Sequence, residues 1–198
     1  KKENSQVDVN FFVNESFPKT INKIKFYGNS NTKDSTLRKQ IFLKPGELYN
    51  SSLIKKSINN LSRRPYIDNV TSNVTDNNDK SANLDFIISE RVKSGNFKLG
   101  AGYSAQGGVA SAVGLSDSNF YGTGNKLNGE LSLSSKSIFY DLSYTKFYLG
   151  DYLIDNSYRI FNDQEDLKTN YGYKRKSSGL DFTIKIPQKY DVSKDQYF

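Results

Sequence analysis

Residues 119–125 read Asn-Phe-Tyr-Gly-Thr-Gly-Asn and place two aromatic side chains beside two glycines that can form a tight turn. A second stretch of this kind, Lys-Phe-Tyr-Leu-Gly, occupies residues 146–150. The segments around both turns alternate apolar and polar residues, which is the pattern of strands with one apolar face. A soluble β-sandwich alternates too, but aromatics at one end of successive hairpins are typical of the aromatic belt of a membrane β-barrel.

Six segments of the second half carry this alternation, and we expect each to be a strand of an antiparallel transmembrane β-barrel. They are residues 96–105, 109–118, 126–135, 138–147, 152–162 and 178–186. Polar connections at 106–108, 134–137 and 162–176 occupy the ends opposite the aromatic turns, as expected of loops that face outside. Membrane barrels have roughly eight strands or more and leave no open edge, so the pattern predicts a barrel truncated to about six strands.

The composition argues against several classes of protein. The chain contains 13 Phe and 14 Tyr, which argues against disorder, while its hydrophobic content of 35% and mean hydropathy of −0.68 are low for a self-contained core. Cys and His are absent, which removes disulfides, thiol nucleophiles and the usual histidine base or zinc ligand. The acidic residues are scattered without a catalytic pair, so we expect no enzyme, no cofactor and no metal site.

The charge distribution bears on the partners. The net charge is +7, and residues 1–91 carry 15 Lys and Arg against 10 Asp and Glu. No nucleic-acid-binding motif accompanies this excess, so we expect no nucleic acid partner. An ordinary solvated basic face is the simplest interpretation, and attraction to an anionic membrane surface is the functional one. No apolar run approaches the roughly 20 residues of a transmembrane helix.

Residues 20–91 have the pattern of a compact α+β domain with the order β-α-α-β-β. A first strand carries Ile24 and Phe26 and ends at Gly28-Asn29. Two further strands are expected at 67–75 and 82–91, joined by an Asp-Asn-Asn-Asp turn.

Two helices are expected between the first strand and the second. Asp34 should cap a helix that carries Leu37 and Ile41. Asn50 or Ser51 should cap another, which ends before Pro65. Its apolar stripe consists of Ile54, Ile58 and Leu61. This stripe needs an apolar sheet face to cover, so both helices should lie on one face of a three-stranded sheet.

Five segments resemble the BamA-type family of outer-membrane β-barrel assembly proteins. Residues 21–29, Ile-Asn-Lys-Ile-Lys-Phe-Tyr-Gly-Asn, are similar to the first strand of the family's last polypeptide-transport-associated (POTRA) domain, and residues 34–39 and 61–67 are similar to its helix motifs. Residues 95–103, Gly-Asn-Phe-Lys-Leu-Gly-Ala-Gly-Tyr, resemble the first barrel strand, and residues 119–125 resemble the first periplasmic turn. Arg-Pro-Tyr-Ile stands at the second helix end where Gly-Phe-Phe is common, and its Tyr and Ile still supply apolar bulk.

The resemblance implies three units along the chain. Residues 1–19, with alternating apolar residues at 7–13, would be the end of a preceding POTRA domain and a linker; residues 20–91 the membrane-proximal POTRA domain; and residues 92–198 the N-terminal part of the barrel. The POTRA domain would lie in the periplasm, with the aromatic turns at the periplasmic membrane interface and residues 162–176 outside the cell.

The resemblance also implies a function and its sites. Such proteins fold and insert other β-barrel proteins into the bacterial outer membrane, and their partners are unfolded outer-membrane proteins, accessory lipoproteins and outer-membrane lipid. Clients would pair with the freed edge of the first barrel strand, a lateral gate formed here by Phe97, Lys98, Leu99, Gly100, Ala101, Gly102 and Tyr103. A POTRA edge strand with Val70, Thr71, Ser72, Asn73 and Val74 could accept a client by β-augmentation. Gly122 and Gly124 belong to the periplasmic turn.

Two alternatives stay open. The glycines of the gate strand fit a weak seam, because glycine packs little within a strand, but small residues also fit a curved barrel wall. A POTRA-containing outer-membrane translocator that exports one dedicated partner would have similar domains. The alternation at 7–13 favours several POTRA repeats and hence the assembly factor.

Overall fold

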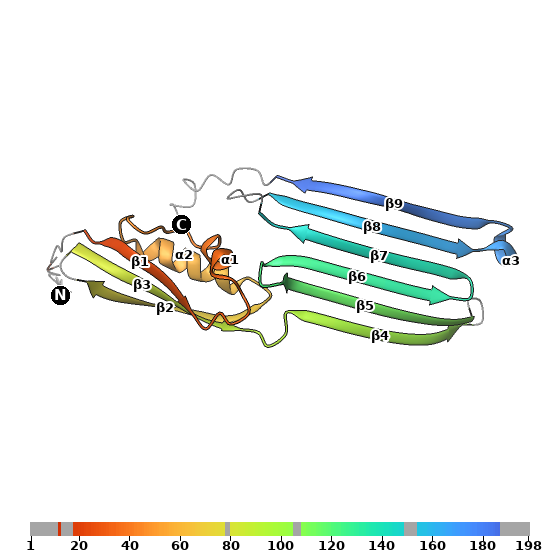
Figure 1. The fold of residues 1–198 in the computed structure, drawn as a ribbon, viewed down its shortest axis with the longest axis horizontal. Coiled ribbons are helices and arrows are strands. Elements are labelled where there is room, and N and C mark those ends of the chain that lie inside the picture. The colour runs from red at the N-terminus through yellow and green to blue at the C-terminus, as the bar shows by residue number, and fades with distance from the viewer. Residues whose placement is uncertain (1–11, 13–17, 78–79, 105–107, 149–153, 187–198) are drawn as a thin grey trace, which may run out of the picture.

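The fold comes from a computed structural model that describes residue 12 and residues 18–77, 80–104, 108–148 and 154–186 (Figure 1). A small α+β domain is followed along the chain by a separate six-stranded sheet. Apart from Phe12, the strand expected at 7–13 lies outside the described residues. Within the described ranges, no helix has both the length and the apolar character needed to cross a membrane.

The first domain has the predicted order β-α-α-β-β. Its elements are β1 (Thr20–Tyr27), α1 (Asp34–Arg38), α2 (Ser51–Ser62), β2 (Ile67–Asn77) and β3 (Ser81–Glu90). The sheet order is β1-β3-β2, with β1 parallel and β2 antiparallel to the central strand β3. The predicted position of β2 at an edge is therefore confirmed.

Both helices cover one face of this sheet, as the apolar stripe of α2 predicts (Figure 1). Leu37 of α1 and Ile54 and Leu61 of α2 are buried against sheet residues such as Phe86, which is fully buried. Asn50 caps α2, because its side-chain oxygen accepts hydrogen bonds from the backbone N–H groups of Ser52 and Leu53.

The prediction for the first helix was partly wrong. Asp34 does not cap α1 but is its first residue, and its carboxylate accepts a hydrogen bond from the Asn29 side chain. Ile41 lies beyond the end of α1, although it still packs against the core. The helix stops early because α2 binds the following backbone: the side chain of Asn60 donates to the carbonyl of Gln40 over 2.7 Å.

The second sheet is an antiparallel meander in the order β4-β5-β6-β7-β8-β9, which confirms the six predicted strands. The strands are β4 (Gly95–Ser104), β5 (Gly108–Phe120), β6 (Asn125–Ser134), β7 (Ser137–Lys146), β8 (Asp155–Asp166) and β9 (Lys174–Lys185). In the described part of the chain the sheet does not close, and β4 and β9 form its two edges.

The strand register gathers the apolar residues on one face. Leu99 lies opposite Val113, Val113 opposite Leu131, and Leu131 opposite Tyr140, so the apolar rows of successive strands are continuous. These side chains are exposed, Leu99 to 75%. A continuous exposed apolar face is unfavourable in water and matches the lipid-facing side of a membrane barrel.

The last hairpin differs from the prediction. Residues 162–176 are not a long loop, because β8 runs on to Asp166, a single-turn helix α3 (Lys168–Tyr171) forms the connection, and β9 begins at Lys174. Opposite charges face each other across the extended hairpin: Lys174 pairs with Asp166 at 2.8 Å and Arg175 with Asp163 at 2.9 Å. These cross-strand ion pairs allow polar residues, which resemble a loop in sequence, to form strands.

Candidate functional site

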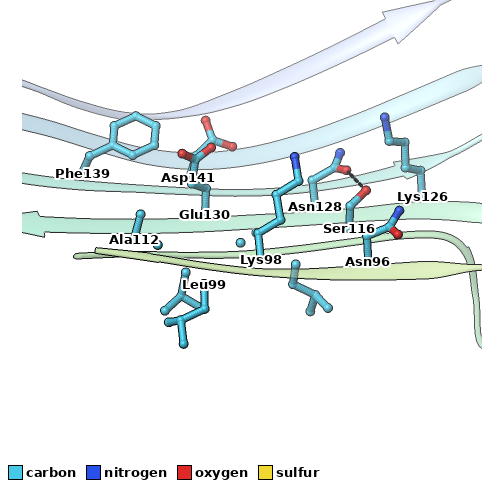
Figure 2. Close-up of a pocket in the computed structure, with 15 residues that line it drawn as sticks. Asn96, Lys98, Leu99, Ala112, Ser116, Lys126, Asn128, Glu130, Phe139 and Asp141 are labelled. Carbon is cyan, nitrogen blue, oxygen red and sulfur yellow. Dashed lines mark hydrogen bonds between the residues drawn. The ribbon is translucent and has the colours of Figure 1, made fainter. Parts of the chain in front are cut away.

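The strand expected to form the lateral gate, β4, is an edge strand of the described part of the sheet. It pairs with β5 from Gly95 to Ser104, and no described strand lies on its other side. Phe97, Leu99 and Tyr103 are exposed on the apolar face, while Lys98 lies on the opposite, polar face (Figure 2). A Cβ atom added at Gly100 or Gly102 would meet nothing within 4 Å, so these glycines do not serve close packing among the described residues.

The polar face beside β4 is a concave surface with alternating charge (Figure 2). The aliphatic part of the Lys98 side chain lies beside Gly114 of β5. A Cβ atom built on Gly114 would be 3.6 Å from the Lys98 Cβ. Glu130 and Asp141 lie directly opposite each other on β6 and β7. Arg159 of β8 binds Asp141 and Asp181, so the like charges are compensated within the sheet.

The POTRA sheet has two edge strands, β1 and β2. The loop at 46–49 covers the beginning of the outer edge of β1, because Ile21 N–H donates to the Glu47 carbonyl over 2.8 Å and Tyr49 N–H donates to the Lys19 carbonyl over 2.8 Å. Along Val70–Val74, β2 pairs only with β3 among the described residues. Val70 points into the core, whereas Val74 is partly exposed.

The turn between β5 and β6 docks onto the POTRA domain. Tyr121, Gly122 and Gly124 all have positive φ, of 53°, 70° and 69°. The carbonyl of Gly122 accepts hydrogen bonds from the Lys33 N–H at 2.9 Å and the Thr36 hydroxyl at 3.0 Å. A Cβ on Gly122 would lie 2.1 Å from the Asn31 carbonyl oxygen, so only glycine fits this close approach.

Asn119, a buried residue at the start of the turn, forms a further hydrogen bond to the POTRA domain. Its side chain is 5% exposed, donates to the Thr32 hydroxyl over 2.8 Å and accepts from the Gly124 N–H over 2.8 Å. Sequence reasoning identified the turn as an aromatic interface element but missed this contact. The only signal was the asparagine at its start, and nothing in the spacing indicates a partner 87 residues away.

Glu90 hydrogen-bonds to residues 30–32, the POTRA segment that contacts the turn between β5 and β6. Its carboxylate accepts hydrogen bonds from the N–H groups of Asn31 at 2.8 Å and Thr32 at 2.7 Å, and from the Ser30 hydroxyl at 3.2 Å. Burial alone would raise the pKa of Glu90, but the hydrogen bonds from Thr32, Asn31 and Ser30 together lower it below its ordinary value.

Two tyrosines lie on the other side of the docked turn. Burial raises the pKa of Tyr66 to about 12, so its hydroxyl stays protonated at neutral pH. Tyr148, which follows β7, donates to the Lys39 carbonyl over 3.1 Å. The structure therefore places Tyr148, which belongs to the second aromatic turn, against the POTRA domain.

Comparisons with known proteins agree with this architecture. The family described as "Surface antigen variable number repeat", the POTRA repeat, matches residues 19–91, and the "Omp85 superfamily domain" matches residues 119–197. The chain thus contains a POTRA domain followed by part of an Omp85 superfamily domain.

Several curated relatives of the chain are BamA proteins. The chain is 26% identical over 192 residues to the outer membrane protein assembly factor BamA of Neorickettsia risticii (strain Illinois), covering 96% of this chain and 26% of that protein. It is 24% identical to BamA of Neisseria meningitidis serogroup B, covering 84% of this chain and 22% of the relative. The chain thus spans about a quarter of the length of these curated relatives.

Solved structures also match this arrangement of a POTRA domain and a barrel sheet. The crystal structure of BamA from Haemophilus ducreyi lacking POTRA domains 1–3 matches with a TM-score of 0.68 and 29% identity, over 84% of this chain and 32% of that one. CdiB from Escherichia coli matches with a TM-score of 0.53 and 15% identity over 84% of this chain and 32% of that one, a likeness of fold alone. The BamA-type resemblance predicted from the sequence is confirmed.

Proposed function

We propose that this chain helps to fold and insert β-barrel proteins into the bacterial outer membrane, with its POTRA domain in the periplasm. The observation that carries the proposal is the edge strand β2 of the POTRA domain, which pairs only with β3 among the described residues. In Figure 1 β2 and the first barrel strand β4 both lie along the lower side of the molecule. An extended client chain could therefore pair with the POTRA domain first and with the barrel sheet next.

The physical need for such edges is clear. An unpaired N–H or C=O group costs several kcal/mol in the hydrocarbon of a membrane, so a nascent strand cannot enter alone. A strand that lends its own backbone ladder supplies the missing hydrogen bonds. Recognition through the backbone suits clients of diverse sequence and requires neither covalent chemistry nor a cofactor.

The side chains of β4 support the same role. Phe97, Leu99 and Tyr103 belong to the exposed apolar face, which would contact outer-membrane lipid. Gly100 and Gly102 contribute little packing, and this favours a seam that opens.

The orientation follows from the junction. The turn at Gly122 and Gly124 is held against the POTRA domain, so that end of the sheet would lie at the periplasmic interface. The connection with α3 is at the other end of the strands and would face outside the cell (Figure 1).

Folding assays with the intact protein in lipid vesicles test the proposal. Several unrelated urea-unfolded barrel proteins are added, and folding is followed by heat-modifiable gel mobility. We expect faster folding of all of them than in protein-free vesicles of the same lipid. Transport of one dedicated partner, with no acceleration of barrel folding, would instead identify the translocator.

A further inference from the structure

A small cavity lies where the docked turn, the end of α2 and the end of β7 meet. Its volume is about 100 Å³. Arg64 of the POTRA domain and Lys126 of the barrel both line it, together with Tyr66 and Tyr148. Among the described residues, no Asp or Glu lines this cavity, so its wall carries two cations without a carboxylate.

Three neutral donors of the cavity wall are already engaged. The Thr36 hydroxyl donates to the Gly122 carbonyl over 3.0 Å, the Thr123 hydroxyl to the Phe120 carbonyl over 2.6 Å, and the Tyr148 hydroxyl to the Lys39 carbonyl over 3.1 Å. An acceptor entering the cavity would therefore meet the charged donors together with the protonated Tyr66 hydroxyl.

Arg64 has a buried hydrogen-bond donor, its Nε–H group, without an acceptor among the described residues. Its Nη2 donates to the Asn60 side chain over 3.0 Å, but its Nε is buried and has no hydrogen-bond partner in the described structure. A guanidinium does not lose its proton at accessible pH, and burying a charged N–H without a partner is costly. Tyr66, 4% exposed and protonated, supplies an adjoining wall without negative charge.

Lys126 approaches from the barrel. It is the second residue of β6 and lies on the polar face, where it also lines the concave surface beside β4 (Figure 2). Lys126 therefore lines both the cavity and the polar face of the sheet.

We propose that this cavity binds a small oxyanion, a carboxylate or phosphate group, between Arg64 and Lys126. A water occupies about 30 Å³, so the cavity holds either about three waters or one such group. The guanidinium and the ammonium are the donors that carboxylates and phosphates prefer. Because one cation belongs to the POTRA domain and the other to the barrel, a bound anion links the two and favours the docked arrangement.

Binding measurements on the intact protein, reconstituted in zwitterionic nanodiscs, test this site. Inorganic phosphate and acetate are titrated separately by calorimetry at fixed ionic strength, with chloride as the reference anion. We expect saturable binding of phosphate or acetate that weakens roughly tenfold or more in Arg64→Gln and in Lys126→Gln, as loss of a charge-assisted hydrogen bond predicts.

Matched controls remove the same charge nearby. Arg63→Gln alters the exposed neighbour of Arg64, and Lys146→Gln alters a lysine that lies at the end of β7 and does not line the cavity. Both should bind the anion as the unmodified protein does. Heat-modifiable mobility shows that each variant is folded, and the barrel-side variant keeps the test valid if Arg64→Gln misfolds.

Three outcomes would overturn the site. The first is no saturable binding of phosphate or acetate, which means that the cavity holds water only. The second is binding that is equally strong in Arg64→Gln and Lys126→Gln. The third is binding that requires anionic lipid vesicles and fails with free anions, which would place the site on a lipid-facing surface instead.

Discussion

Replacing Gly122 by alanine should separate the barrel turn from the POTRA domain. The new Cβ would lie 2.1 Å from the Asn31 carbonyl oxygen and 3.4 Å from the Lys33 nitrogen, and φ at this position is +70°. An L side chain in the left-handed region costs about 1–2 kcal/mol. If the turn withdraws, the two hydrogen bonds to the Gly122 carbonyl are also lost, each worth about 1 kcal/mol.

Because the backbone strain is present in the docked and in the separated turn, the two lost hydrogen bonds set the change: the docked arrangement should be disfavoured by roughly 2 kcal/mol, about a 30-fold change in the ratio of docked to separated molecules. Spin labels at the exposed residues Lys55 and Lys168 report this ratio as a distance distribution between the POTRA domain and the barrel. We expect a narrow distribution in the unmodified protein and a broad one in Gly122→Ala.

Gly172→Ala is the matched control. Gly172 has a similar φ of +79°, but a Cβ there would meet nothing within 4 Å, so only the backbone strain is shared. The control should keep the narrow distribution. A narrow distribution in Gly122→Ala, or equal broadening in both variants, would refute the steric account of the junction.

Three further predictions concern the same surfaces. Asn119→Ala should weaken docking by about 1–3 kcal/mol, because it leaves buried polar groups unpaired. A double-mutant cycle with Thr32→Val should show that the two effects are not additive, whereas additive effects would mean that the two side chains act independently. Because the pKa of Glu90 is lowered in the folded state, its contribution to the stability of the POTRA domain should be present above its ordinary pKa and lost as the pH falls through the lowered pKa. Glu90→Gln should remove this part of the acid dependence of the free energy of unfolding, and an unchanged acid profile would contradict the assignment. Adding a peptide with the sequence of a barrel strand should slow amide exchange along Val70–Val74, and unchanged exchange there would count against β-augmentation.

The sequence allowed the strand faces to be predicted because they depend on a period of two residues. Phe97, Leu99 and Tyr103 alternate with polar residues, and the observed register places them on the apolar face. The apolar stripe of α2 likewise predicted which face packs on the sheet, since helical periodicity is a local property.

Features that depend on distant residues could not be predicted. Residues 162–176 have the composition of a loop, and only the pairing of Asp166 with Lys174 and of Asp163 with Arg175 makes their ends into strands. The end of α1 is determined by Asn60 of the next helix. The contact of Asn119 with Thr32 joins two units of the chain, and a single sequence carries no signal for such a pair.

Crosslinking along β4 during client assembly tests the central claim most directly. Each residue from Phe97 to Tyr103 is replaced singly with Cys in the intact protein and paired with a Cys in the last strand of a client barrel, in living cells. The 198 residues of this sequence contain no Cys, so each introduced Cys is the only one within them. Strand templating predicts strong crosslinks along β4 and weak ones along β6 (Asn125–Ser134), whose two edges are already paired with β5 and β7. Crosslinking along β4 that is no stronger than along β6 would contradict the proposal that clients pair with this edge.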